Sequence, residues 1–199
     1  MKKISLFALI LSFGTMVNAQ EASFGLKAGL NVSTLSNSDG GERGSRLGLH
    51  AGALAHIHLT HKLALQPEIV YSSQGAKYTV LDGEHSLALN YINIPLQLQY
   101  MFNNGFRLQT GPQVGFLVGV NDKLDGDETG IFTSDDFKTV DFAWSAGLGY
   151  LTYSGIGVDA RYNFGISNIN DAQNATVRNN VFQIGLFYMF DNAHKRKSR

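Results

Sequence analysis

Apolar and polar residues alternate along almost the whole chain from residue 24 onward, which is the two-residue period of a β-strand. Leu47 to Leu59 shows the pattern most clearly, because every odd position there is Leu, Ala or Ile. Each such segment is near or above the roughly 9–11 residues with which a tilted strand crosses a bilayer. Eight segments carry the pattern: 24–32, 47–59, 63–71, 87–102, 106–118, 140–150, 156–164 and 182–190. We therefore predict eight antiparallel strands.

Two features predict irregularities within these strands. In the fourth segment Leu87, Leu89 and Tyr91 lie on odd positions, whereas the apolar residues of 92–102 lie on even ones. We expect a β-bulge near Tyr91 to explain this change of parity. Proline removes a hydrogen bond from a sheet, so we expect bulges or broken pairing at all three prolines, which fall inside predicted strands: Pro67, Pro95 and Pro112.

The connections alternate between short and long. Three are tight turns, at 60–62, 103–105 and 152–154. Four are long and polar, at 33–46, 75–86, 119–138 and 165–180. Short turns at one end and long loops at the other are typical of up-and-down barrels in the bacterial outer membrane, whose long loops face the medium.

Alternation alone leaves open a soluble, lipocalin-like barrel, which has the same two-faced strands. The glycines favour the membrane barrel, because they lie on the polar face, and an eight-stranded barrel leaves little space inside. Outward-facing aromatic residues also gather near both strand ends, as they do in the belts of membrane barrels. The predicted fold is an all-β, eight-stranded antiparallel up-and-down transmembrane β-barrel. The glycines concerned are Gly25, Gly29, Gly48, Gly52, Gly111, Gly115, Gly147, Gly149, Gly157 and Gly185.

The first 19 residues have the features of a secretory signal peptide. Lys2 and Lys3 precede the apolar run 4–13, and a small residue, Ala19, follows at the expected cleavage position. We predict a signal peptide over 1–19 cut after Ala19, a barrel over 20–190 and a basic tail over 191–199. The expected location is the cell outer membrane. The chain has no cysteine, and its 16 basic and 16 acidic residues give no indication of a nucleic-acid partner.

The polar face carries three basic and three acidic residues, and we expect these charges to form a network that fills the barrel, because unpaired charges in so narrow a space are costly. A selective pore is the less favoured alternative. Three histidines of the second strand face the same way and are expected to join the network. The predicted interior network is Lys27, Glu68, Arg107, Asp141, Asp159, Arg161, His50, His56 and His58.

Two loops and three histidines contain weak candidates for metal binding or catalysis. His56 and His58, with His61 in the next turn, are candidate metal ligands, but we favour the interpretation that these histidines are structural. The acidic residues within 122–128 lack the spacing of a dedicated calcium loop. His85 and Ser86 near Asp82 are the only candidate catalytic group, and they carry little specificity. We expect no cofactor, no metal and no catalytic site.

Short motifs follow one another over essentially the whole chain after residue 20. They are Leu65-Gln-Pro-Glu68, Tyr71-Ser-Ser-Gln-Gly75, Tyr91-Ile-Asn-Ile-Pro95-Leu, Gly111-Pro112 leading to Gly115-Phe-Leu, Val158-Asp159-Ala-Arg161-Tyr162 with Gly165 and Asn168, and the closing Phe-Tyr-Met-Phe190. In this order, the motifs resemble those of the PorT-type outer-membrane β-barrel proteins of the Bacteroidota. The resemblance implies the same fold and location. The founding member of that family takes part in a system that exports proteins across the outer membrane, so the resemblance implies protein secretion as a candidate role. The family has no catalytic motif to transfer.

Three functions are consistent with this sequence. The first is a non-enzymatic, monomeric outer-membrane barrel that is surrounded by lipid and acts through its outer loops. The second is an accessory component of a protein secretion or assembly complex, which would need a protein partner. The third is a soluble periplasmic barrel that binds a ligand.

Overall fold

The computed structural model describes residues 22–37, 44–80, 83–124, 127–128, 132–170 and 176–190. The predicted signal peptide 1–19, its cleavage after Ala19 and the basic tail 191–199 lie outside the described residues. Among the described residues, no helix has the length and the hydropathy of a membrane span.

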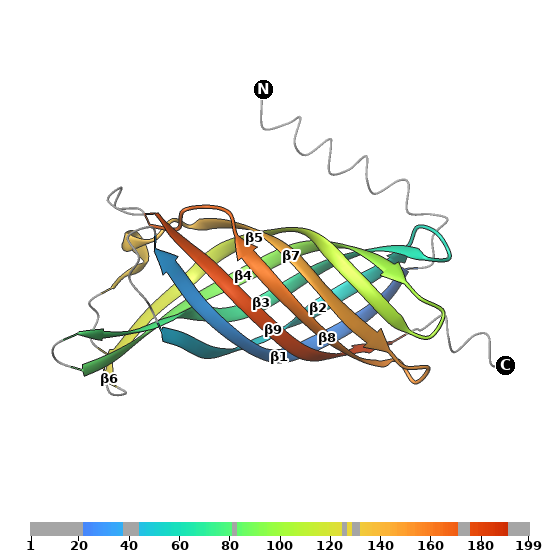
Figure 1. The fold of residues 1–199 in the computed structure, drawn as a ribbon, viewed down its shortest axis with the longest axis horizontal. Helices are drawn as coiled ribbons and strands as arrows, with labels where there is room; N and C mark the ends of the chain where they lie inside the picture. The colour runs from blue at the N-terminus through green and yellow to red at the C-terminus, as the bar shows by residue number, and fades with distance from the viewer. Residues whose placement is uncertain are drawn as a thin grey trace, which may run out of the picture.

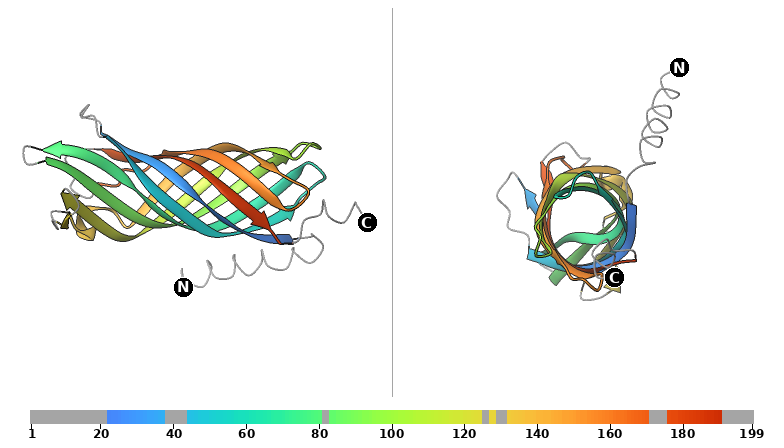
Figure 2. Two further views of the ribbon diagram at one scale, coloured as in Figure 1. Left: turned by 90° about the horizontal axis from the view of Figure 1, so that it is seen from below. Right: turned by 90° about the vertical axis from the view of Figure 1, so that its right-hand side faces the viewer.

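Eight long antiparallel strands close into a barrel, as the sequence predicts (Figures 1 and 2). Each strand pairs with its neighbours along the chain, and the pairing of β1 with β9 completes the ring. A two-residue strand, β6 (Asp127–Glu128), and a 3-10 turn, η2 (Ser134–Asp136), lie in the connection between β5 and β7. The barrel strands are β1 (Ala22–Asn37), β2 (Gly44–His58), β3 (Leu63–Val80), β4 (Gly83–Met101), β5 (Phe106–Leu124), β7 (Val140–Leu151), β8 (Ile156–Gly165) and β9 (Val177–Met189).

The register fixes the shear of the barrel. Hydrogen-bonded neighbours followed from Ala22 once round the ring return to β1 at Val32, ten residues further on. With eight strands, this shear corresponds to a tilt of roughly 35–45° and to an interior that side chains can fill. The path runs through Ile57, Leu65, Leu98, Thr110, Ala146, Tyr162 and Phe182.

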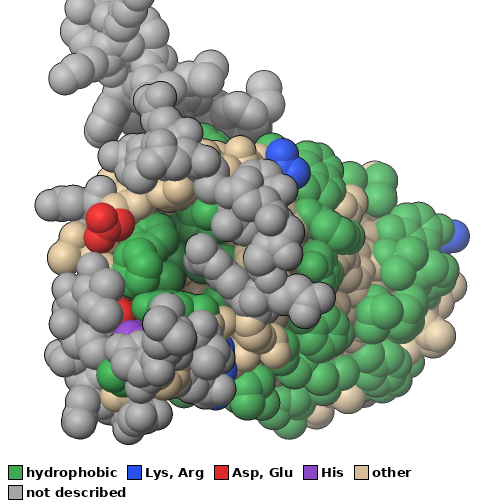
Figure 3. All heavy atoms as spheres, turned by 60° about the vertical axis from the view of Figure 1, so that its left-hand side comes forward, with side chains coloured by type: hydrophobic (Ala, Val, Ile, Leu, Met, Phe, Trp, Pro, Cys, Tyr) green, Lys and Arg blue, Asp and Glu red, His purple; other side chains and the backbone are tan. Residues whose placement is uncertain are grey.

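The outer wall of the barrel is apolar, and Figure 3 shows hydrophobic side chains covering much of it. Leu, Ile and Val side chains such as Ile184, which is 51% exposed, alternate with buried polar ones along every strand. Exposed aromatic side chains form one belt near the short turns and another nearer the long loops. The first contains Tyr100, Phe102, Tyr150, Tyr188 and Phe190, and the second contains Tyr71, Phe116, Phe142, Tyr162 and Phe164. A soluble barrel cannot expose this surface to water, so the third of the hypotheses above is excluded.

Glycines on the inner face allow close approach of neighbouring strands. A Cβ atom at Gly111 would collide with the backbone oxygen of Leu96, and one at Gly52 would collide with that of Ile69. No larger residue fits at either position without a shift of the backbone. The glycine-bearing face is therefore the crowded, concave one.

Each proline interrupts one ladder. The pairing of β2 with β3 stops beside Pro67, that of β3 with β4 stops beside Pro95, and that of β4 with β5 stops beside Pro112. The register is the same on both sides of each gap, and each proline stays paired with its other neighbour: Leu96, Gln113 and Trp144, respectively. The prediction of broken pairing is confirmed, and the gaps form an oblique line across three adjacent strand pairs.

The change of parity in the fourth segment has a different cause from the one we predicted. A register shift does lie between Asn90 and Tyr91, but the extra residue is Val118 of β5, and β4 keeps one parity throughout. Leu87, Leu89 and Tyr91 instead point into the barrel, on the same face as Asn93 and Gln97. The apolar residues move from the outer to the inner face because this part of β4 lies beyond the apolar belt.

The same extension corrects one predicted loop. The segment 75–86 is mostly strand, because β3 continues to Val80 and β4 begins at Gly83. β3, β4 and β5 have 18, 19 and 19 residues, which exceeds the roughly 9–11 that cross a bilayer. These strands therefore project well beyond the outer-wall belt at the end that carries the long loops.

Candidate functional site

Four charged side chains form the centre of the barrel interior. Lys27 Nζ lies 3.3 Å from Glu68 Oε2 and 3.0 Å from Asp159 Oδ2. Arg161 donates to both oxygens of Glu68, at 3.0 and 3.1 Å, and to Asp159 at 2.6 Å. All four side chains are at most 6% exposed. This group, which we name the charge quartet, has two positive and two negative members, and it joins β1, β3 and β8 across the lumen.

The other two predicted charges differ in their distance from the quartet. Arg107 borders it, because the side chains of Arg107 and Asp159 lie on either side of Gly149. Arg107 donates to Gln99 Oε1 at 3.3 Å, and its guanidinium lies 5.5 Å from the centre of the Phe187 ring. Asp141 accepts a hydrogen bond of 2.6 Å from Ser167 Oγ. Asp141 pairs across the sheet with Gly115, which is eight residues along β5 from Arg107, so the two charges lie at different heights in the barrel.

The three histidines point inward from β2. His50 Nδ1 lies 2.8 Å from Asn31 Oδ1, and His56 Nδ1 lies 3.3 Å from Gln66 Oε1. The rings of His56 and His58 meet edge to face, with centres 4.7 Å apart. Within the described ranges, no three His, Asp or Glu side chains are placed to hold a metal ion, and His61 does not join His56 and His58.

Apolar side chains close the lumen near the short turns. Leu54 of β2, Leu151 of β7, and Phe187 and Met189 of β9 form one buried cluster. In the ring of strands, β1 separates β2 from β9, and β8 separates β9 from β7. The cluster therefore spans five of the eight barrel strands and reaches across the lumen. We call it the short-turn plug.

A larger apolar cluster closes the lumen at the other end, where the long loops emerge. Its fully buried members come from β1, β3, β4, β9 and the segment after β8, and side chains of the β5–β7 connection pack against it. We call it the long-loop plug. Its core consists of Leu35, Ala76, Leu87, Leu89, Tyr91, Ile169 and Val177, with Phe132 and Phe137 packed on it. The odd-position residues of the fourth segment were the signal for it in the sequence.

A small polar group lies beside the long-loop plug. Tyr78 stacks on His85 with ring centres 4.9 Å apart, and its hydroxyl donates to Asp122 Oδ1 at 3.0 Å. His85 Nδ1 lies 3.6 Å from Asp122 Oδ2. Ser86 follows His85 on a strand, so their side chains point to opposite faces, and Asp82 and Asp125 lie outside the described residues. The predicted catalytic group is therefore not assembled by the residues that the structure describes.

The interior is thus layered: an apolar plug, a polar middle and a second apolar plug. Several buried amides of the middle layer, among them both polar atoms of Gln97 and the Nδ2 atom of Asn93, have no partner among the described protein atoms. Groups of this kind are ordinarily satisfied by enclosed water. An eight-stranded barrel filled in this way has no continuous aqueous channel.

Comparisons with known proteins agree with this architecture. A family model described as outer membrane protein beta-barrel domain matches residues 18–171. The crystal structure of Neisserial surface protein A superposes with a TM-score of 0.56 at 17% identity, over 85% of this chain and 99% of that one. Ail, the attachment invasion locus protein of Yersinia pestis, gives 0.53 at 15% identity over the same shares. No curated protein matches the chain.

The two structural similarities support the fold, and the family model covers about three quarters of the 199 residues. The narrower resemblance to the PorT-type proteins stays a prediction. With the family established, the short-turn end is the periplasmic end and the long-loop end is the extracellular end. The chain belongs to the outer membrane protein beta-barrel domain family and is an integral protein of the outer membrane.

Proposed function

We propose that this protein is a monomeric, non-enzymatic and non-conducting outer-membrane barrel that acts by contacting partners through its extracellular rim. The single observation that carries the proposal is the closure of the lumen by the two plugs. The two plugs and the charge quartet between them fill the interior, so we assign the interior a structural role. Any activity of this barrel is then expected at its outer surface.

The extracellular rim is the surface best suited to contacts. β3, β4 and β5 carry it beyond the bilayer, and the long-loop plug supports it from inside. Strands packed on an apolar core form a rigid surface, and a rigid surface loses less conformational entropy on binding. The periplasmic end offers only three short turns between described strands.

Site-specific photo-crosslinking in living cells tests the proposal. A photoreactive residue at Lys123, which is exposed at the extracellular end of β5, is compared with one at Asn103 in a periplasmic turn. We expect a discrete adduct with a component of the medium or of another cell from position 123, and none from position 103. A reproducible adduct with an envelope protein from position 103 alone would reject the proposal and favour the accessory component of a secretion or assembly complex.

A further inference from the structure

Lys138 and the start of β9 lie close together at the extracellular end of the barrel. The backbone N–H of Lys138 donates to the carbonyl oxygen of Ile169 at 2.9 Å, and that of Ile169 donates to the carbonyl oxygen of Val177 at 2.9 Å. Two hydrogen bonds and the single residue between them bring the backbones of Lys138 and Val177 to within about 10 Å of each other. The β5–β7 connection, the segment after β8 and the first residues of β9 meet at this point (Figure 1).

The long-loop plug fixes the direction of the side chains here. Phe137 and Val177 pack in the plug, and each is followed by an exposed basic residue, Lys138 and Arg178 respectively. The chain is extended at both positions, because Val177 begins β9 and Phe137 forms an antiparallel bridge with Asn170. Successive side chains of an extended chain point to opposite faces, so the two cations face away from the plug.

Both basic residues lie just above the lipid-facing wall. Phe142, a member of the extracellular aromatic belt, follows Lys138 by four residues, and the exposed Phe182 follows Arg178 by four residues on β9. Four residues of a strand span roughly 13 Å, which at the tilt of this barrel is a rise of about 10 Å toward the medium. The two cations therefore lie at the level of the headgroups of the outer leaflet.

The acidic residues of this end do not neutralise the two cations. Three acidic side chains are described there, and each already accepts a hydrogen bond within the protein: Asp122 from Tyr78, Asp136 from Thr133 and Asp141 from Ser167. Lys138 and Arg178, in contrast, have no ion pair with any side chain that the structure describes. Their positive charge is available to a group outside the protein.

The other described basic residues of this end are placed differently. Arg46 is half-buried and donates two hydrogen bonds of 3.1 Å to β3. Lys77 is half-buried as well. Lys123 is exposed, but it lies seven residues beyond Phe116 of the aromatic belt, and so further from the membrane. Among the described residues of this end, Lys138 and Arg178 are the exposed cations nearest the lipid.

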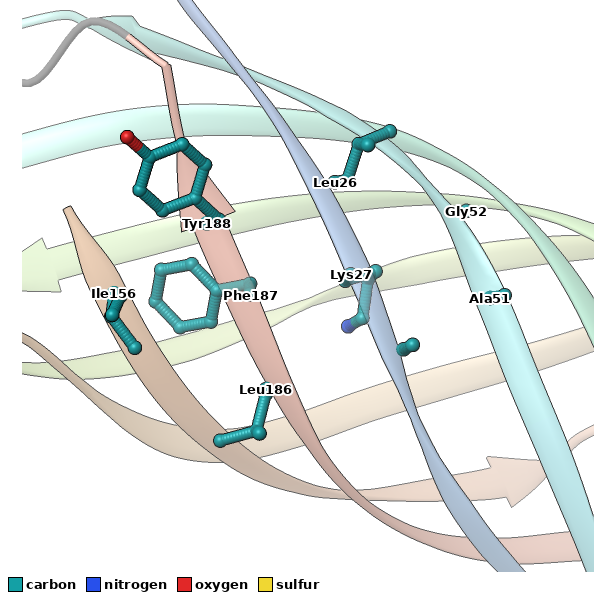
Figure 4. Close-up of a pocket in the computed structure, with 9 residues that line it drawn as sticks. Leu26, Lys27, Ala51, Gly52, Ile156, Leu186, Phe187 and Tyr188 are labelled. Carbon is teal, nitrogen blue, oxygen red and sulfur yellow. The ribbon is translucent and has the colours of Figure 1, made fainter.

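A groove in the lipid-facing wall near the periplasmic end provides a contrast. Its outward side chains are leucine, isoleucine, alanine and tyrosine (Figure 4). Lys27 is the one charged residue that lines the groove, and it is paired within the charge quartet. Such a surface contacts every lipid tail alike, since lipid tails are as apolar as leucine. A pair of exposed cations at the headgroup level, in contrast, distinguishes lipids by the charge of the headgroup.

We propose that Lys138 and Arg178 together bind one phosphate on the headgroup of the outer-leaflet glycolipid. The outer leaflet of a bacterial outer membrane is built of a glycolipid whose sugars carry phosphate. Arginine donates two parallel hydrogen bonds to a phosphate and lysine adds a compact charge, so the pair suits an oxyanion with several acceptor atoms. The site lies beside β7 and β9, apart from Lys123 of β5, and the proposal does not depend on the partner contacts proposed above.

Native mass spectrometry of the full chain in detergent tests the proposal with lipid A that carries two phosphates and with the same lipid A after enzymatic dephosphorylation. Both lipids have identical acyl chains, so only the phosphates differ. We expect the phosphorylated form to be retained at least about tenfold more than the dephosphorylated form. Lys138→Gln with Arg178→Gln should abolish this preference and leave retention of the dephosphorylated form unchanged.

The matched control is Lys62→Gln with Lys123→Gln, which removes the same net charge from two exposed positions outside the site and should keep the preference. Heat-modifiable mobility on a gel verifies that each variant is folded. A preference that persists in the site variant would overturn the proposal, as would equal retention of the two lipids by the parent chain. An equal loss of preference in the site variant and the control would also overturn it, since the attraction would then come from net charge alone.

Discussion

Glu68→Gln removes one of the two carboxylates of the charge quartet and leaves Lys27 and Arg161 opposite Asp159 alone. The Glu68 side chain is fully buried, and it accepts hydrogen bonds from Lys27, Arg161 and Gln66. Removing one partner from a buried ion pair costs about 3–5 kcal/mol, because an uncompensated charge remains in a medium of low dielectric constant. We expect a loss of that size in the free energy of unfolding.

Adding Lys27→Met to Glu68→Gln removes one charge of the opposite sign and leaves the neutral pair of Arg161 and Asp159, whose nitrogen and oxygen lie 2.6 Å apart. The double variant should recover to within about 1–2 kcal/mol of the parent, because complete replacement of a buried pair is often close to neutral. Urea unfolding in lipid or detergent, followed by the fluorescence of Trp144, measures both variants. Trp144 is the only tryptophan and lies on the lipid-facing wall.

Two results would refute the charge-balance reasoning. One is a loss of unfolding free energy in the double variant that is as large as, or larger than, the loss in Glu68→Gln alone, and the other is a loss below about 1 kcal/mol in Glu68→Gln.

Three further substitutions test other features of the fold by the same unfolding assay. Gly111→Ala should cost about 1–3 kcal/mol, because its Cβ would meet the backbone oxygen of Leu96, whereas Gly119→Ala should be tolerated, since its nearest neighbour is 3.7 Å away; equal losses would contradict the close-approach argument. Leu89→Ala removes a fully buried member of the long-loop plug and should cost about 2–5 kcal/mol; a loss below about 1 kcal/mol would place Leu89 outside a packed core. Ile184→Arg, in the middle of the lipid-facing wall, should cost about 2–4 kcal/mol, and Ser45→Arg, near the extracellular end of β2, about 0–1 kcal/mol; the reverse order would contradict the placement of the membrane belt.

The fold could be predicted from the sequence because the same two-residue period runs through every strand. Residues such as Gly52 and Gly111 also indicated which face is crowded. The extracellular part was wrong in the prediction, because we treated the apolar face as lipid-facing along the entire strand. Above the bilayer, water covers the outside, so Leu87 and Leu89 turn inward and the strand continues without a bulge of its own.

The partners inside the barrel could be predicted only as a set. Parity places Lys27, Glu68 and Arg161 on the inner face, but it does not determine which of them meet. That depends on the shear, because Glu68 and Arg161 are 93 residues apart in sequence and share a height only in the closed register. The register depends in turn on irregularities such as the extra residue Val118. The change of parity in the sequence predicted this bulge near Tyr91, but assigned it to β4 instead of to the neighbouring β5. Asp141 was grouped with the quartet for this reason, although it lies at another height in the barrel.

Conductance across a planar lipid bilayer tests the central claim, that two apolar plugs and the charge quartet close the lumen. The refolded full chain, verified as inserted by its heat-modifiable mobility, should give no resolved single-channel steps in molar KCl. A variant with Leu54, Phe187 and Leu89 all changed to Ala opens both plugs, and any conductance that it gains over the parent measures how much the plugs contribute beyond the charge quartet. Silence from the parent chain is the result that the closed lumen predicts. Regular single-channel steps from the parent chain itself would contradict it and would make the barrel a pore.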